Sequence, residues 1–227
     1  TQTITVEDTM SPELIIPSDY TTECSEDLVL DDADASDPCS EVTIDVSSET
    51  VPGDAIGNYT VIRTFTATDD AGNSTSATQT ITVEDTMSPE LIIPADYTTE
   101  CSEDLALDDA TASDNCSEVT IEVSSETIPG DVAGNYTVVR TFTATDDAGN
   151  ATSATQTITV QDTTSPELSI PADYTVECSG DIILASASAV DNCGTADITE
   201  SFDTVPGDAA GNYVIVRTFV ATDDAGN

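Results

Sequence analysis

Polar and apolar residues alternate along several short stretches of the chain, and this period of two predicts β-strands rather than helices. Residues 1–6 and 42–46 alternate throughout, and residues 59–68 form the longest stretch of this kind. One face of that stretch is predicted to be apolar and consists of Tyr59, Val61, Phe65 and Ala67. Gly, Pro, Asn and Asp gather between the stretches and predict turns at 52–54, 57–58 and 70–73.

The chain repeats itself with a long period. The sequence Thr-Gln-Thr-Ile-Thr-Val begins at Thr1, Thr78 and Thr155, so the spacing is 77 residues. The first two copies differ at ten aligned positions, and the third keeps the register without insertion. A period of this length fits one whole small domain. We therefore expect an all-β chain of tandem immunoglobulin-like β-sandwich domains arranged end to end.

The repeat also predicts the domain boundaries. Residues 1–8 are expected to be the final strand of a preceding repeat. Three immunoglobulin-like repeats follow at 9–85, 86–162 and 163–227, and the third is expected to lack its last strand. The linkers between repeats are short and contain no Gly, which favours a stiff connection.

Acidic residues dominate the charge and exclude several classes of partner. The chain has 45 Asp and Glu against 3 Lys and Arg, a formal net charge of -42. A nucleic-acid surface needs clustered basic residues, so we expect no nucleic-acid partner and no direct membrane insertion. Such a chain attracts cations instead. Acidity alone can also indicate disorder, but 38% of the residues are hydrophobic and they lie in strand-like runs.

Six cysteines recur in pairs at a constant spacing: Cys24 and Cys39, Cys101 and Cys116, Cys178 and Cys193. An even count at fixed spacing in a loop-rich β-chain predicts disulfides and an oxidising, extracellular location. We expect each pair to close a disulfide within its own repeat, so that Cys24 would bond to Cys39 in the first repeat. A metal–thiolate site is the alternative, which two Cys per repeat and the absence of His disfavour.

Arg63 lies at an inward position of the longest predicted strand, and Arg140 and Arg217 are its copies. A buried guanidinium needs a carboxylate or a carbonyl as a partner. We expect a structural ion pair near the end of the sheet, and a functional Arg is the alternative.

Several segments resemble the hyalin-repeat (HYR-like) immunoglobulin-type domains. They are Gly-Asn-Tyr-Thr at 57–60, Arg-Thr-Phe-Thr-Ala-Thr-Asp-Asp-Ala-Gly-Asn at 63–73, Thr-Gln-Thr-Ile-Thr-Val-Glu-Asp-Thr at 78–86, and the segments 95–101 and 113–116. The resemblance covers each whole repeat and is closest to repeat arrays in surface adhesins of Bacteroidetes-like bacteria. It implies a stalk or a cell-surface adhesin. Family members often have Cys before the Gly-Asn of the loop, where this chain has Ala71, Ala148 and Ala225.

The same resemblance implies a modification at the linkers. The triplets Asp-Thr-Met and Asp-Thr-Thr look like the O-glycan acceptors of that phylum. The candidate glycosylation sites are Thr9, Thr86 and Thr163.

Carboxylates are expected to converge where two domains meet. In a sandwich of this order, the loop before the last strand lies beside the incoming linker, so residues 69–73 should face residues 7–9. Hard oxygen ligands in such a cluster suit calcium. The candidate metal ligands, which recur in every copy, are Asp8, Asp37, Asp69, Asp70, Asn73, Asp85, Asp114, Asp146, Asp147, Asn150, Asp162, Asp191, Asp223 and Asp224. We expect a structural Ca²⁺. The alternative is a turn alone, because Asp-Asp-Ala-Gly-Asn is also a good β-turn sequence.

These patterns favour a structural function over catalysis. The chain has no His and no Lys, so it offers no imidazole or amine base. We expect a segment of a long extracellular, cell-surface protein that acts as a calcium-stiffened stalk or adhesin shaft. Its partners are neighbouring repeats of the same chain. The alternatives are an adhesive module that binds surface glycans or proteins, and a self-assembling filament or surface-layer subunit.

Overall fold

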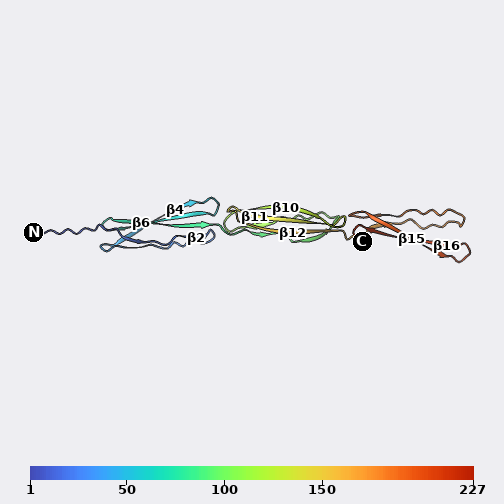
Figure 1. Ribbon diagram of the computed structural model, residues 1–227, viewed down its shortest axis with the longest axis horizontal. Coiled ribbons are helices and arrows are strands. Elements are labelled where there is room, and N and C mark those ends of the chain that lie inside the picture. The colour runs from blue at the N-terminus through green and yellow to red at the C-terminus, as the bar shows by residue number, and fades with distance from the viewer. The chain divides into compact units, whose positions relative to one another are not determined.

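The computed structural model describes residues 1–227, and every regular element in it is a β-strand. This confirms the predicted all-β class. The strands of the first repeat are β1 Glu13–Ile15, β2 Tyr20–Glu23, β3 Asp34–Ser36, β4 Val42–Pro52, β5 Tyr59–Asp69 and β6 Ser74–Glu84. Figure 1 labels β2, β4 and β6 of this repeat. The structure contains no helix that is long and apolar enough to span a membrane.

Two sheets form the sandwich of the first repeat. The larger sheet has the order β2-β6-β5-β4, and the smaller one pairs β1 with β3. β5 lies antiparallel to both β4 and β6, with Val61 opposite Ile81 in the second pair. β2 lies parallel to β6, with Tyr20 opposite Ile81. Because β2 and β6 run in the same direction, residue Cys24 after β2 lies at the same end as Glu84 of β6.

The core lies on the inward face of β5 and β6. Alternate residues of β5 are buried, as the sequence pattern predicts, and Phe65 and Ala67 have no exposed surface. Val61, Ile81 and Val83 form a buried cluster, and Tyr20, Leu28 and Tyr59 pack against it. The remaining polar positions of β5 stay half-buried, so one face of the strand supplies the core and the other meets solvent.

The second repeat reproduces this plan. Its strands are β7 Glu90–Ile92, β8 Tyr97–Glu100, β9 Thr111–Ser113, β10 Val119–Pro129, β11 Tyr136–Asp146 and β12 Ala151–Gln161. β10, β11, β12 and β8 form the larger sheet in that order, and β7 pairs with β9. Val138, Ile158 and Val160 form the buried cluster that matches the one in the first repeat.

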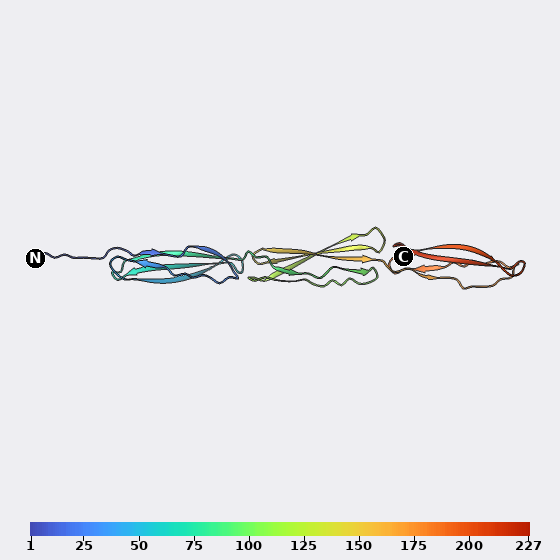
Figure 2. The same ribbon diagram turned by 90° about the horizontal axis from the view of Figure 1, so that it is seen from below.

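The third repeat has four strands, which are β13 Glu167–Ser169, β14 Ser188–Val190, β15 Ala196–Pro206 and β16 Tyr213–Asp223. β15 and β16 form a two-stranded antiparallel sheet along their full lengths (Figure 2), and β13 pairs with β14. No strand lies on the other side of β16. Phe219, the counterpart of Phe65, is therefore only half-buried.

Residues 1–6 were predicted as a strand and are not one in the structure. Their sequence is identical to residues 78–83, which lie in β6 between β5 and β2. The alternating pattern is therefore present, but the neighbouring strands that would complete its hydrogen bonds are not. Ile4 and Val6 remain 76% and 90% exposed.

The predicted ion pair of Arg63 is wrong in the first two repeats. Arg63 is buried, and Nη1 donates to the backbone oxygen of Asp31 at 2.8 Å and to Oε1 of Gln79 at 3.0 Å. Its guanidinium also lies 4.8 Å from the ring centroid of Phe65. Arg140 repeats both kinds of contact. Neutral oxygens suffice because they satisfy the donors without burying a second charge. Only Arg217 forms an ion pair, with Glu200.

By their internal contacts, the residues form two compact units. The first consists of residues 1–92, 110–122 and 143–153, and the second of residues 93–109, 123–142 and 154–227. The predicted boundaries at Thr9, Thr86 and Thr163 stay predictions, and we keep them to number the repeats.

Candidate functional site

The disulfides differ from the predicted pairing. Cys24 bonds to Cys116 and Cys101 bonds to Cys193, so each bond joins one repeat to the next. Cys39 and Cys178 are free and exposed. Pairing within a repeat is wrong, because Cys24 lies beside the end of β6 whereas Cys39 lies with Asp8 and Asp69, near the start of β6. The eleven residues of β6 span about 35 Å, and a disulfide needs Cα atoms within about 7 Å.

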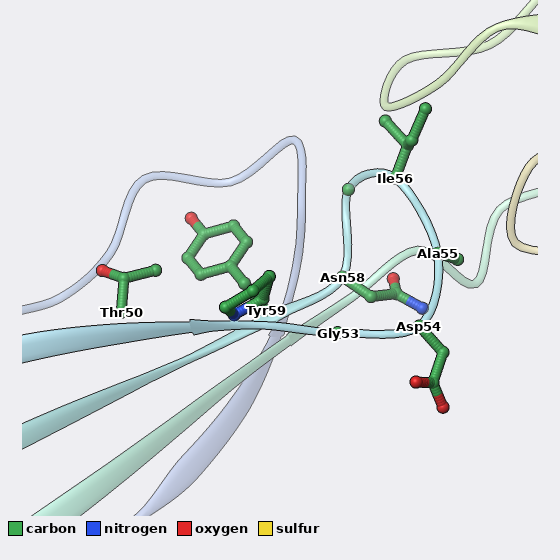
Figure 3. Close-up of a pocket in the computed structure, with 9 residues that line it drawn as sticks. Thr50, Gly53, Asp54, Ala55, Ile56, Asn58 and Tyr59 are labelled. Atoms are coloured by element: carbon green, nitrogen blue, oxygen red, sulfur yellow. The ribbon is translucent and has the colours of Figure 1, made fainter.

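The hairpin loop between β4 and β5 approaches the first disulfide closely. Gly57 has φ +90°, and a Cβ built on it would lie 3.3 Å from Cβ of Cys116. Figure 3 shows Asn58 folded into the shallow hollow of this loop, while Ile56 and Asp54 point outward. Oδ1 of Asn58 accepts a hydrogen bond from the backbone N–H of Asp85 at 2.7 Å. The loop thus lies against Cys116 of the disulfide and forms a hydrogen bond with the residue that follows β6.

Three carboxylates meet next to this disulfide, and we call them the Asp85 cluster. Asp85 follows β6, Asp114 follows β9, and Asp146 ends β11. One carboxylate oxygen of each lies within 4.8 Å of the others. These are residues that the sequence analysis expected to converge. Their oxygens are hard ligands of the kind that calcium takes.

Asp85 is the residue of this cluster whose charge is least compensated. It is 5% exposed, and its Oδ1 is buried without any hydrogen-bond partner. Oδ2 accepts one hydrogen bond, from the hydroxyl of Ser117 at 3.3 Å. Burial, followed by the charges of Asp114 and Asp146, raises the pKa of Asp85 above its ordinary value. A cation at this point would offset both the cost of burying the Asp85 charge and its repulsion by Asp114 and Asp146.

The other two carboxylates are positioned by local hydrogen bonds. The backbone N–H of Cys116 donates to Oδ1 of Asp114 at 2.8 Å. Asn150 donates from its backbone N–H to Oδ1 of Asp146 at 2.8 Å and from its side chain to Oδ2 at 2.9 Å. The same side-chain amide also donates to the backbone oxygen of Asp85 at 3.2 Å. Asn150 therefore fastens the loop after β11 to the linker.

Asp162, Asp191 and Asp223 form a matching group, the Asp162 cluster, with one oxygen of each within 4.8 Å of the others. Burial, followed by the charges of Asp191 and Asp223, outweighs the hydrogen bond from Thr164 and raises the pKa of Asp162. Burial also acts on Asp223, but the hydrogen bonds from Asn227 and the turn outweigh it and lower the pKa of Asp223. Oδ2 of Asp191 is buried without a partner.

At the start of the chain two of the corresponding residues, Asp8 and Asp37, lie with the thiol of Cys39 and form the Asp8 cluster. Oδ2 of Asp8 and Oδ2 of Asp37 lack hydrogen-bond partners. The charge of Asp8, followed by burial and the charges of Asp37 and Asp69, raises the pKa of the Cys39 thiol. Asn73 donates to the backbone oxygen of Asp8 at 3.4 Å and to Oδ2 of Asp69 at 2.8 Å.

Not every predicted ligand lies in a cluster. Asp70, Asp147 and Asp224 are exposed and lie outside all three groups. Asp69 also lies outside them, although it is buried. Oδ2 of Asp224 accepts a hydrogen bond from Thr195 instead. The Asn residues enter as hydrogen-bond donors that shape the turn rather than as oxygen ligands, because the turn brings each side-chain amide against the preceding Asp.

Glu23 and Glu100 were not singled out from the sequence, yet each fastens a linker. Oε2 of Glu23 accepts a hydrogen bond from the hydroxyl of Thr86 at 2.8 Å, and Oε1 accepts from the backbone N–H of Thr86 at 2.9 Å. Glu100 makes the same contacts with Thr163, and these hydrogen bonds lower the pKa of Glu100. Their recurrence directly before Cys24 and Cys101 was the available signal.

Comparison with known proteins places these features in a family context. The family model described as "Bacterial Ig-like domain" matches residues 15–85 and 92–162. Hyalin of Lytechinus variegatus is 33% identical over 210 residues, which cover 83% of this chain and 38% of that protein. Hyalin of Strongylocentrotus purpuratus is 34% identical over 200 residues, which cover 80% of this chain and 16% of that protein. The chain thus spans well under half the length of either relative.

Solved structures that this chain matches include human CDH23 EC21-23. It is 17% identical, the match covers 96% of both chains, and the TM-score is 0.35. Drosophila N-cadherin EC1-4 is 15% identical, the match covers 95% of this chain and 65% of that one, and the TM-score is 0.32. At these scores the family assignment rests on the sequence matches alone.

Proposed function

Because the chain belongs to the family of bacterial Ig-like domains, we propose that it is a structural segment of a long extracellular protein. In this proposal it acts as a stalk or adhesin shaft whose successive repeats are fastened by a disulfide and a calcium ion. Disulfides persist in oxidising surroundings, which supports an extracellular, cell-surface location. The bonds Cys24–Cys116 and Cys101–Cys193 support the fastening, because both cross from one repeat to the next.

One observation carries the calcium part of the proposal. Oδ1 of Asp85 is buried and has no hydrogen-bond partner, and Asp85 lies in a cluster with two further carboxylates. A carboxylate in that position is costly without a counter-charge. Calcium accepts six to eight oxygens in flexible geometry, so backbone oxygens or water can complete the shell around three carboxylates. Fixing these residues would fix the linker against the loops of the next repeat.

Thermal unfolding with and without calcium tests this proposal. The melting temperature of the 227-residue chain should rise in millimolar calcium compared with excess chelator, because a ligand that binds only the folded state stabilises it. Magnesium should act more weakly, since it demands near-ideal octahedral geometry. Superimposable melts in calcium and chelator would contradict the calcium part. The disulfides would then be the only covalent or ionic links between repeats.

A control variant separates the cluster from the general acidity of the chain. Asp70→Asn removes one charge from an exposed residue that lies outside the clusters, whereas Asp85→Asn removes one from inside. The calcium-dependent rise of the transition that includes the first unit should shrink in the Asp85 variant and persist in the Asp70 variant. An equal loss in both variants would point to diffuse screening of the -42 charge and against a site.

A further inference from the structure

The two disulfides enclose parts of the chain that overlap. Cys24–Cys116 and Cys101–Cys193 each close a loop over a sequence separation of 92 residues. The repeat is 77 residues long and thus shorter than this separation, so the second loop begins before the first has ended. The stretch that belongs to both loops is residues 101–116, which we call the shared segment.

This overlap creates a short covalent route through the chain. From Cys24 the route crosses the first disulfide to Cys116, follows the shared segment backward to Cys101, and crosses the second disulfide to Cys193. Its backbone part has about 15 residues and reaches at most about 54 Å, whereas the about 169 residues of continuous backbone between Cys24 and Cys193 reach about 600 Å. Each disulfide adds a Cα–Cα distance of 5.9 Å. A pull on the two ends is carried by the route that becomes taut first, which is the short one.

The short route has little slack. The counterpart of the shared segment in the first repeat is residues 24–39, which has the same length. There Cys24 lies beside Glu84 at the end of β6, and Cys39 lies with Asp69 near the start of that strand. The segment therefore already spans the length of β6, about 35 Å, out of a reach of about 54 Å. Unfolding of a repeat lengthens this route by only about 20 Å, whereas it lengthens about 77 residues of continuous backbone by about 240 Å.

Hydrogen bonds hold the shared segment in place along its length. The guanidinium of the buried Arg140 donates to the backbone oxygen of Asp108 at 2.8 Å, near the middle of the segment. The hydroxyl of Tyr97 donates to the backbone oxygen of Ala106 at 3.0 Å. Closer to its other end, β9 pairs with β7. The recurring arginine thus contacts the part of the repeat through which the short route passes.

We propose that the overlapping disulfides make this chain a shaft that bears tension through covalent bonds and keeps its length even when its repeats unfold. The tension passes through the shared segment. The long strands β10, β11 and β12 lie outside the short route, so an extending force does not pull on them directly. The inference rests on the proposed shaft function for the source of the tension, and it does not rest on calcium.

Stretching single molecules of the 227-residue chain tests this inference. The chain is held at its two termini in chelator and concentrated urea, and it is pulled until further force adds no length. Reduction of the disulfides should increase this final length by about 550 Å, because it releases about 154 residues at about 3.6 Å each. The final length of an unfolded chain does not depend on calcium, so the result is separate from the calcium part of the proposed function.

Opening one loop at a time reveals the overlap. Cys24→Ser with Cys116→Ser should add about 220 Å to the final length of the oxidised chain, and so should Cys101→Ser with Cys193→Ser. Opening both loops should add about 550 Å, which is about 110 Å more than the sum of the two gains. The excess arises because in either single-loop variant the shared segment lies inside the loop that remains closed and is not stretched. Each length is read on the unfolded chain, so a variant that folds poorly gives the same information.

Two results would overturn the proposal. One is a gain on reduction of only about 160 Å, which three disulfides closed within single repeats would produce. The other is a gain for the open chain that equals the sum of the two single-loop gains, since this would mean that the loops share no residues. If the gains exceed the sum while calcium leaves the melting temperature unchanged, the covalent route stands and only the calcium part of the proposed function fails.

Discussion

The Asp85 cluster and the Asp8 cluster lie at matching positions of successive copies of the repeat, yet they differ in composition and in environment. The Asp85 cluster contains three carboxylates, whereas the Asp8 cluster contains Asp8, Asp37 and the thiol of Cys39. Asp85 is 5% exposed and its pKa is raised by burial and by its neighbours, whereas Asp8 is only half-buried. The loop that carries Gly57 and Asn58 covers Asp85, and the disulfide of Cys24 lies beside it. No equivalent loop or disulfide lies beside Asp8, and Cys39 is free.

This difference shows where the properties of the site originate. The candidate ligand residues lie on the linker and on the repeat that follows it, as Asp85, Asp114 and Asp146 do. Their burial, however, is provided by the repeat that precedes the linker. The local sequence therefore specifies which oxygens converge, and the docked neighbour determines how much their charge costs.

Removal of the junction disulfide should have the largest effect. The double variant Cys24→Ser, Cys116→Ser opens a link between residues 92 positions apart. A loop of that size corresponds to about 4 to 5 kcal/mol of chain entropy in the unfolded state. We expect the unfolding transition that includes the first unit to move to a lower urea concentration. Tyr fluorescence measured across a urea titration would record this shift.

The matched control for that variant is Cys39→Ser. Cys39 is exposed and unbonded, so its replacement should change the free energy of unfolding by less than about 0.5 kcal/mol. Equal effects of the two substitutions would mean that the junction disulfide does not constrain the folded repeats. The Asp85 cluster would then owe its burial to the loop alone.

Asp85→Asn should have opposite effects in calcium and in chelator. In chelator the variant should be more stable than the natural chain, because it removes a buried charge from beside Asp114 and Asp146. In calcium it should bind the ion at least about tenfold more weakly, because affinity follows the number of charged ligands. Calorimetric titration and melting curves measure the two effects. Asp8→Asn should change the stability in chelator and the calcium affinity in the same directions as Asp85→Asn. Both changes should be smaller, since Asp8 is more exposed.

If Asp85→Asn lowered the stability in chelator instead of raising it, the Asp85 carboxylate would be a net stabilising hydrogen-bond acceptor. That outcome would contradict the electrostatic account of the cluster, although not the presence of the disulfide.

The pH dependence in chelator should follow from the direction of the pKa shift. The pKa of Asp85 is raised on folding, so the folded state retains the proton to higher pH than the unfolded state. Ionisation therefore costs stability, which falls as pH rises through the unfolded and folded pKa values and then levels off. The lowered pKa values of Asp69, Glu100 and Asp223 act in the opposite direction, losing stability as pH falls.

The difference between Asp85→Asn and the natural chain isolates this one group. The advantage of the variant should be close to zero at a pH below the ordinary Asp value of 3.8 and should grow toward neutral pH. Melting temperatures of both chains across this range measure the difference. A difference that stays constant with pH would contradict a raised pKa for Asp85.

The sequence predicted the strands and the acidic clusters better than it predicted the connections between repeats. Alternation along residues 59–68 identified the buried face of β5, and recurrence identified Asp85, Asp114 and Asp146. The cysteine pairing failed because a period of 77 residues is equally consistent with Cys24 bonding to Cys39 or to Cys116. That choice depends on β2 lying parallel to β6, a long-range pairing that composition and periodicity do not encode.

The smallest predicted effect concerns the glycine that touches the disulfide, and Gly211 offers a matched control. Gly57 and Gly211 have φ values of +90° and +87°, so alanine should cost on the order of 1 kcal/mol at either position through backbone strain alone. At Gly57 the new Cβ would also lie 3.3 Å from Cβ of Cys116, whereas nothing lies within 4 Å of Gly211. Gly57→Ala should therefore additionally increase the hydrogen-exchange rates of the Asp85 and Cys116 amides. Equal exchange in both variants would show that the loop does not hold the junction, and the burial of Asp85 would have to come from the disulfide and the linker contacts of Glu23.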